Sequence, residues 1–417
     1  SDIGQYFVWY MGFLLIGIAA LIIWRLPKLK ADNEIESLVS REFAFLLNNW
    51  VLLGMMVFVL IATTFPLLSQ WVRGEEVTVG PGFYNKWMVP LGIVLLFLAG
   101  LGPLVAWRKA TGSKLARAMA LPIGVGVTVA VLQILFGARF GYPPLVEPTE
   151  IYDTMTGTVL AWMGAVAPAV SFATCAFVLA SVGQEFWRGM RVRMRKGEGA
   201  GTAIVRLVSK GRRRYGGYIV HIGIVFMYIG FTGAAYDTEE ESALRPGETM
   251  SVGQHTVRYD QPRMEADPNK RMIFTDMTLM DDSGNEDGQV APAKFIYRTH
   301  PQMPTTEVAI RSRPAEDVYV IMSTVDPSTR RGTFRVIIRP LVAWIWFGGI
   351  VLLLGAILGM WPTGREMLRE EVARPRRFRF SPATAVVALA IVVATMMAWA
   401  GVASAQNDSS SSLHAGS

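Results

Sequence analysis

Eight apolar stretches, each long enough to cross a lipid bilayer, constrain this chain more than any other feature. About 20 apolar residues are needed to cross the hydrocarbon core as a helix. The predicted spans are 6–24, 45–68, 87–107, 119–136, 160–182, 215–235, 341–361 and 383–402. Backbone groups in lipid have no water to bond with, so a span of this kind must be helical. With 52% hydrophobic residues, the sequence predicts a polytopic α-helical membrane protein.

Lysine and arginine are distributed unevenly among the connections between these spans. The basic connections are 25–41, 108–117, 188–214 and 365–379, whereas the opposite short loops hold only Arg73, Lys86 and Arg139. Basic connections lie in the cytoplasm, so we expect a multi-pass protein of a bacterial cytoplasmic membrane. The N-terminus and residues 236–339 then face the periplasm. The net charge of +7 reflects this membrane topology and not nucleic-acid binding.

Residues 236–339 differ in composition from the rest, because they are polar and contain short β-like segments. These segments are 252–259, 273–279, 308–310, 318–322 and 333–338, with a predicted hairpin turn at 282–285. The sequence therefore predicts a helical bundle over 1–235, a small outward β domain over 236–339 and a closing helix over 340–363. For residues 364–417 the sequence predicts a basic loop, then an extra anchor or signal-peptide-like helix, and then a flexible tail.

His221 lies inside the sixth apolar span, shortly after the basic run at 212–214. An ionisable side chain in hydrocarbon is costly and faces a partner, a cavity or a metal. Imidazole is a metal ligand, and haem iron is the metal most often held between membrane helices. The alternative is a histidine bonded to a backbone carbonyl or to a serine or threonine nearby. From the residue alone, both interpretations stay open.

Two further histidines and the single cysteine give weaker signals. His255 lies on a predicted strand and His300 precedes a proline, and neither has a ligand-type residue at metal-binding spacing, so we expect structural roles. Cys175 lies in an apolar run and is predicted to be a buried hydrophobic residue, which excludes disulfide frameworks and multi-cysteine metal sites.

Motifs of soluble enzymes, such as a P-loop, GxSxG, HExxH or CxxC, are absent from the sequence. The pairs Gly216-Gly217 and Gly348-Gly349 lie in or beside predicted spans and indicate close helix packing. The segment 202–210 combines apolar and basic residues and predicts a short interfacial helix before the His221 span.

Several distinctive stretches occur in order along nearly the whole chain. They are Ser40-Arg41-Glu42 with 46–50, the loop 77–85, residues 213–217 with His221-Ile222-Gly223, Tyr297 with 305–310 and 317–319, and 339–346 with Gly348-Gly349. Together they resemble the C-terminal half of the CcmF family of cytochrome c-type biogenesis proteins. Chance similarity between apolar helices would not reproduce the polar motifs of the outer domain. The resemblance ends near Trp361.

The resemblance implies a haem lyase that works at the outer face of the cytoplasmic membrane with other cytochrome c maturation subunits. Members of this family receive haem from a covalent haem chaperone and attach its vinyl groups to the CxxCH thiols of apocytochrome c. They also hold a b-type haem, with its iron, between two membrane histidines on different helices. His221 matches the second of that pair.

The family's Trp-rich outward segment, its other membrane histidine and its two outward-facing histidines all precede the matched region. We therefore expect the N-terminal half to be a separate chain or to be missing, which makes this chain an incomplete subunit of a holocytochrome c synthase, with no catalytic residue assigned. Two alternatives remain at this stage. One is a membrane transporter of haem or another small molecule with His221 lining the pathway, and the other is a scaffold in the maturation complex.

Overall fold

The computed structural model describes residues 2–29, 40–105, 112–147, 155–281, 283–326 and 328–361. Within these residues, seven helices are long and apolar enough to cross a membrane. They are α1 (Asp2–Leu29), α2 (Arg41–Arg73), α3 (Pro81–Leu101), α4 (Gly112–Phe136), α5 (Met155–Met194), α7 (Arg212–Gly233) and α8 (Ala343–Met360). Each of the first seven predicted spans falls on one of them. The eighth prediction, 383–402, and the segment 364–417 lie outside the described residues.

Helices α3 and α5 illustrate how the ends of the helices differ from the predicted spans. Helix α3 begins at Pro81, six residues before the predicted start, because a proline at the first helical position needs no backbone N–H partner. The predicted outward loop 77–85 is therefore half helix. Helix α5 continues past the apolar run to Met194, and its last turns carry Arg191 and Arg193 near the C-terminal end, where cations are favoured.

The helices are held together by a small apolar core and by polar contacts near both ends. Leu96, Phe177, Val178 and Val225 form part of the core where α3, α5 and α7 meet. Toward one end, Ser181 Oγ of α5 donates to the carbonyl of Gly100 at 2.6 Å. Cys175 is 2% exposed within this core, as predicted for a buried hydrophobic residue.

The predicted short helix before the His221 span is present as α6 (Ala200–Lys210). Ala203 and Leu207 form its buried face, and Leu207 packs in the same apolar core as Tyr215. Val205 on the other side is 67% exposed. The helix is thus amphipathic, as expected for a segment that lies along an interface.

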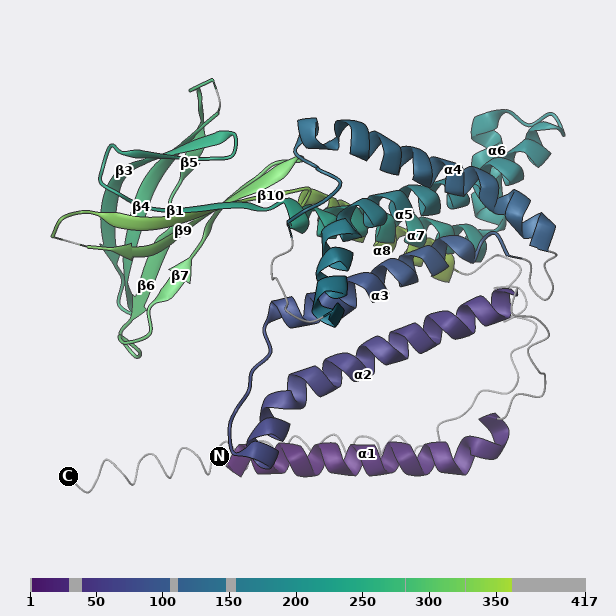
Figure 1. The fold of residues 1–417 in the computed structure, drawn as a ribbon, viewed down its shortest axis with the longest axis horizontal. Coiled ribbons are helices and arrows are strands. Elements are labelled where there is room, and N and C mark those ends of the chain that lie inside the picture. The colour runs from purple at the N-terminus through teal and green to yellow at the C-terminus, as the bar shows by residue number, and fades with distance from the viewer. Residues whose placement is uncertain are drawn as a thin grey trace, which may run out of the picture. The chain divides into compact units, whose positions relative to one another are not determined.

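Ten strands form a β-sandwich between α7 and α8, and the chain enters it through the 3₁₀ turn η2 (Ala234–Tyr236) (Figure 1). One sheet has the order β1 (Thr238–Leu244), β10 (Gly332–Pro340), β9 (Glu316–Val325), β8 (Ala309–Ser312). The other has the order β2 (Thr249–Val252), β3 (His255–Ala266), β4 (Lys270–Met280), β6 (Ala293–Tyr297), β7 (Thr305–Glu307), and β5 (Glu286–Val290) pairs with β4. The described pairings are antiparallel.

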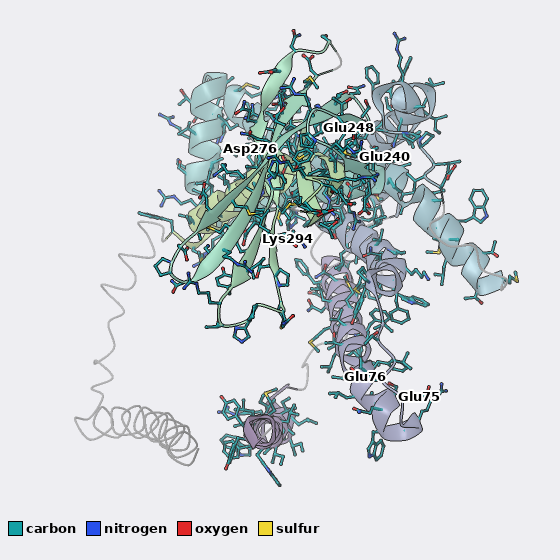
Figure 2. The ribbon with its side chains drawn as sticks, turned by 90° about the vertical axis from the view of Figure 1, so that its left-hand side faces the viewer. Glu75, Glu76, Glu240, Glu248, Asp276 and Lys294 are labelled. Atoms are coloured by element: carbon teal, nitrogen blue, oxygen red, sulfur yellow. The ribbon has the colours of Figure 1, made fainter. Side chains whose placement is uncertain are left out.

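The core of the sandwich comes from residues that alternate along strands of both sheets. Tyr259 and Phe334 are fully buried, and their ring centroids lie 4.8 Å apart across the interior. Met277, Leu279 and Met322 are also fully buried. Charged residues such as Glu240, Glu248, Asp276 and Lys294 belong to the strands or to the loops between them (Figure 2). An apolar interior with charged residues on the strands and loops is typical of a domain that is surrounded by water.

Two of the five predicted strands are wrong in detail. The predicted strand 252–259 is a hairpin, because Gly253 takes a φ of +54° and the chain turns between Val252 and His255. The predicted strand 308–310 is the point where the chain leaves β7 in one sheet at Glu307 and enters β8 in the other at Ala309. The chain turns between β4 and β5 at 283–285, within the predicted turn, with Gly284 at a φ of +78°; residue 282 lies outside the described residues.

Candidate functional site around His221

The helix α7 carries His221 and is positioned first by a seam of glycines against α8. Gly216, Gly223 and Gly230 recur at seven-residue intervals, which places them on one face of α7. A Cβ on Gly223 would lie 2.5 Å from the backbone nitrogen of Leu352, and one on Gly216 would lie 2.7 Å from that of Gly359. The two backbones therefore touch, as small residues allow in membrane helix pairs.

This seam fixes the direction in which His221 points. A helix turns by about 100° per residue, so His221 lies about 140° around α7 from Gly216. Its side chain consequently points away from α8. Tyr228, seven residues later, lies on nearly the same side, and its hydroxyl donates to the carbonyl of Gly92 in α3 at 2.8 Å. His221 thus lies on the side of α7 that faces α3.

Contacts with α5 hold the face of α7 next to His221. Ser171 and Thr232 share a hydrogen bond of 2.6 Å between their hydroxyls. Cys175 Sγ lies 3.8 Å from the carbonyl of Val225. Together with the glycine seam, these contacts hold α7 on two sides and leave little freedom for the helix to rotate.

The imidazole of His221 is partly buried, and its Nδ1 atom is hidden from solvent. Gly217 lies one turn earlier on the same face, and a Cβ placed there would meet no atom within 4 Å. There is therefore room beside the imidazole for a flat group or a further helix. An imidazole next to such open space fits the needs of a haem ligand, and the described residues supply this one histidine on the membrane helices.

An ion-pair cluster anchors the basic end of α7. Glu185 of α5 is 8% exposed and pairs with both Arg214 of α7 and Arg188, the second at 3.0 Å. Arg214 Nε also donates to the Tyr218 hydroxyl at 3.0 Å. A buried carboxylate is tolerated when it is paired in this way. The cluster therefore fixes the position of α7 along the axis of α5.

The histidines of the β domain lie in different surroundings. His255 is 5% exposed, and its Nε2 lies 2.6 Å from Glu316 Oε1. The pair joins β3 of one sheet to β9 of the other. Sequence spacing did not reveal this partner, because the two residues are 61 positions apart. His300 lies in the loop between β6 and β7, is exposed, and has its Nδ1 3.1 Å from Thr299 Oγ1.

Across the part of the chain that the structure describes, no group of three or more histidine, cysteine or acidic side chains is arranged to hold a metal ion. Among the described residues, His221 is therefore not part of such a group.

The fold defines the class: a polytopic helical membrane protein that carries a β-sandwich between two of its membrane-type helices. Residues 235–340 match the family described as "CcmF C-terminal beta-sandwich". These residues therefore resemble the corresponding domain of the CcmF family of cytochrome c-type biogenesis proteins.

Individual relatives agree with this assignment. The chain is 28% identical over 348 residues to cytochrome c-type biogenesis protein CycK of Rhizobium meliloti, which covers 82% of this chain and 46% of the relative. It is 28% identical over 356 residues to CcmF of Pseudomonas aeruginosa, covering 84% and 49%. A solved structure of "Cytochrome c Heme Lyase CcmF" superposes with a TM-score of 0.58 at 21% identity, over 78% of this chain and 46% of that one. The chain thus spans about half the length of the curated relatives it matches.

Proposed function

We propose that this chain is the C-terminal part of a haem lyase that attaches haem covalently to apocytochrome c at the outer face of a bacterial cytoplasmic membrane. In that reaction each cysteine S–H adds across a vinyl C=C bond, so one S–C and one C–H bond form. The family match over the β-sandwich, and the similarity to CycK and CcmF over 82% and 84% of this chain, support this proposal. Apocytochrome c, a haem chaperone and other maturation subunits are the partners it requires.

Within this function, His221 would be one of two histidines that hold a b-type haem. The observation that carries the assignment is the seam of α7 and α8, which turns His221 away from α8 toward a face left open at Gly217. A second histidine, from a region corresponding to the N-terminal half of the relatives, would complete the pair. The iron would supply one-electron redox chemistry, while α7 holds the imidazole in a fixed orientation.

The first test is an absorption spectrum of the chain co-expressed with such an N-terminal half. We expect a low-spin bis-histidine haem, and we expect His221→Ala to lose it or convert it to high spin. His300→Ala is the matched control, because His300 is exposed in a loop of the β domain. An unchanged low-spin spectrum in His221→Ala would contradict the ligand assignment.

The second test separates the lyase from the transporter and scaffold alternatives. Covalently attached haem survives denaturing electrophoresis, so haem staining reports holocytochrome c directly. The lyase proposal predicts staining in a strain lacking the full-length protein when both halves are supplied, and little staining with this chain alone. Transport of haem without staining would favour the transporter, and full staining with His221→Ala would favour the scaffold.

The third test addresses orientation. We propose that the β-sandwich faces the periplasm and the basic connection between α5 and α7 faces the cytoplasm, since cytoplasmic connections are the basic ones. In a Cys175→Ala background, an impermeant thiol reagent should label Ser283→Cys and leave Lys196→Cys unlabelled in intact cells. The reverse pattern would overturn the orientation and the outward haem chemistry together.

A further inference from the structure

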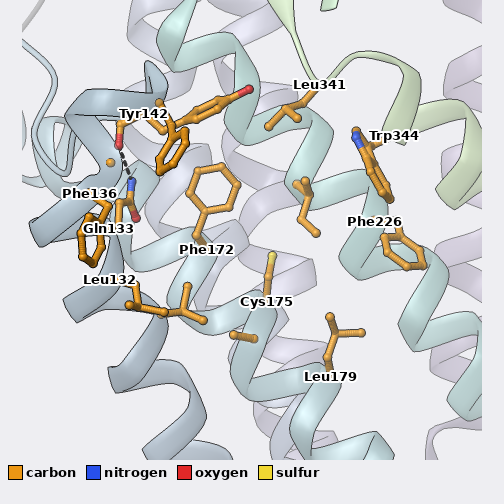
Figure 3. Close-up of a pocket in the computed structure, with 15 residues that line it drawn as sticks. Leu132, Gln133, Phe136, Tyr142, Phe172, Cys175, Leu179, Phe226, Leu341 and Trp344 are labelled. Atoms are coloured by element: carbon orange, nitrogen blue, oxygen red, sulfur yellow. Dashed lines mark hydrogen bonds between the residues drawn. The ribbon is translucent and has the colours of Figure 1, made fainter. Parts of the chain in front are cut away.

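A cavity of about 670 Å³ lies among α4, α5, α7 and α8, near the ends of α4 and α7 (Figure 3). Its walls include Leu132 and Phe136 of α4, Phe172 and Cys175 of α5, and Trp344 of α8. The lining is almost wholly apolar. Leu132 and Phe136 are about half exposed, so the cavity opens sideways, toward the region that hydrocarbon occupies in a membrane.

Gln133 is the polar side chain that departs from this pattern. It is 8% exposed, and its Nε2 donates to the Tyr236 hydroxyl at 3.0 Å and to the Tyr142 carbonyl at 3.4 Å. Its Oε1 is buried and has no donor within the described residues. A buried acceptor without a donor is costly. A molecule in the cavity that brings an N–H or O–H group would remove that cost.

The charges around Gln133 indicate what kind of head group fits. Gln133 lies in the last turn of α4, where the helix carbonyls favour a cation. Arg139 follows in the 3₁₀ turn η1 (Gly137–Phe140), whose Gly137 and Phe140 line the cavity. Arg139 is exposed and is available to an anion. The carbonyl end of α4 attracts the positive part of a head group, and Arg139 attracts its negative part. The two together therefore fit a zwitterionic head group.

We propose that the cavity binds one acyl chain of a phospholipid whose head group carries a primary ammonium, as in phosphatidylethanolamine. The ammonium donates to Gln133 Oε1, the phosphate pairs with Arg139, and the chain lies against the apolar walls. The quaternary ammonium of phosphatidylcholine has no N–H group and cannot satisfy Gln133. This inference does not depend on the proposed haem function.

Lipid retention tests the proposal. The full 417-residue chain is reconstituted in bilayers with equal amounts of phosphatidylethanolamine and phosphatidylcholine, extracted in mild detergent, and weighed by native mass spectrometry. We expect one retained phospholipid per chain and a preference of about tenfold for phosphatidylethanolamine, the scale of one hydrogen bond to a charged group. Equal retention of both lipids, or no retained lipid, overturns the proposal.

Two pairs of variants separate the head group from the chain. Gln133→Met should abolish the preference while a lipid is still retained, whereas Gln70→Met, on exposed α2, should change nothing. Ala176→Phe fills the cavity from α5 and should remove both lipids, whereas Ile134→Phe, on the exposed side of α4, should not. Retention that survives Ala176→Phe, or a preference that survives Gln133→Met, contradicts the site.

A surface variant covers the case in which the buried variants fail to fold. Arg139→Gln changes an exposed side chain and leaves the packing of α4 and α5 intact. It should weaken retention of both lipids several-fold, because both carry the phosphate. Retention equal to that of the wild type would show that the phosphate is not bound here, and the proposal would fail.

Discussion

The α7–α8 pair and the β-sandwich are consecutive in the chain but are held together in opposite ways. Along α7 and α8, Gly223 and Gly348 bring the backbones into contact, and most of the outward side of α8 is exposed. In the sandwich, large side chains such as Phe334 and Met277 are fully buried. In lipid, pairing two apolar helices gains no hydrophobic free energy, so close backbone packing stabilises the pair instead. In water, the burial of apolar area stabilises the fold.

The difference predicts which substitutions each region tolerates. A helix seam made of backbone contacts cannot accept even one added carbon, because backbone atoms cannot move aside as a side chain can. A sandwich core fails in the opposite direction, when carbon is removed and a cavity remains. The same chain should thus be sensitive to enlargement in one region and to truncation in the other.

The largest effect is expected for Gly348→Ala in the seam. The new Cβ would lie 2.6 Å from the carbonyl oxygen of Gly223 and 2.7 Å from the backbone nitrogen of Met227. We expect a loss of more than about 4 kcal/mol, the range of the most damaging substitutions, seen as loss of monodisperse protein in detergent. Gly349→Ala is the matched control, because its Cβ would meet no atom within 4 Å. If both variants behave alike, backbone contact does not hold α8.

The second-largest effect on stability is expected when a side chain in the core of the β-sandwich is truncated. Met277→Ala removes a fully buried side chain and should cost roughly 2–5 kcal/mol. Met264→Ala, at a side chain that is 62% exposed, should stay within about 0.5 kcal/mol of the wild type. Hydrogen exchange of peptides from β4 and β9, followed by mass spectrometry, measures the loss. Comparable protection in the two variants would show that this core is not the main source of stability.

The sequence predicted the membrane helices well, because span length follows directly from bilayer thickness. Gly216 and Gly348 pack closely as predicted from the glycine pairs, but Gly217 and Gly349 beside them face open space. The seven-residue recurrence of Gly216, Gly223 and Gly230 was the signal in the sequence that distinguishes the packed glycine of the pair. It fixes the direction of His221 as well.

The β domain was less predictable, because its contacts are distant in sequence. A single φ of +54° at Gly253 turned one predicted strand into a hairpin. At Val308 the chain passes from one sheet to the other. Where it does so depends on which strands lie nearby in space, and local β propensity carries no such information. The pairing of His255 with Glu316 has the same origin, since a spacing of 61 residues matches no local motif.

That pair provides a smaller effect, specific to the sandwich. His255→Ala leaves Glu316 without the imidazole that joins the sheets, and we expect a loss of roughly 1.5–3 kcal/mol, the scale of a hydrogen bond to a charged group. His255→Gln keeps a donor and should recover part of it. His300→Ala, in the exposed loop, should have no measurable effect. Protection lost in β3 and β9 together supports the bridge, whereas loss in β3 alone would point to simple packing.

The smallest effect concerns pH and should be confined to the region that faces water. Hydrogen bonds from the side chains of Ser328 and Thr329 lower the pKa of the Asp326 carboxyl to about 2 in the folded chain. An unfolded aspartate titrates at about 3.9. The ionised form therefore stabilises the turn between β9 and β10 above about pH 4, and this contribution is lost as the pH falls toward 2.

Asp326→Asn tests that contribution, because the amide cannot ionise. Hydrogen exchange in β9 and β10 should depend less on pH between 4 and 2 in the variant than in the wild type. Glu240→Gln, at an exposed carboxylate of β1, is the control for a general change in charge. Exchange along α7 and α8 should not respond to either variant, because the two helices meet through backbone contacts at glycines and through apolar rings, none of which titrates. If the helix pair and the turn lose protection together, the two regions are not held independently.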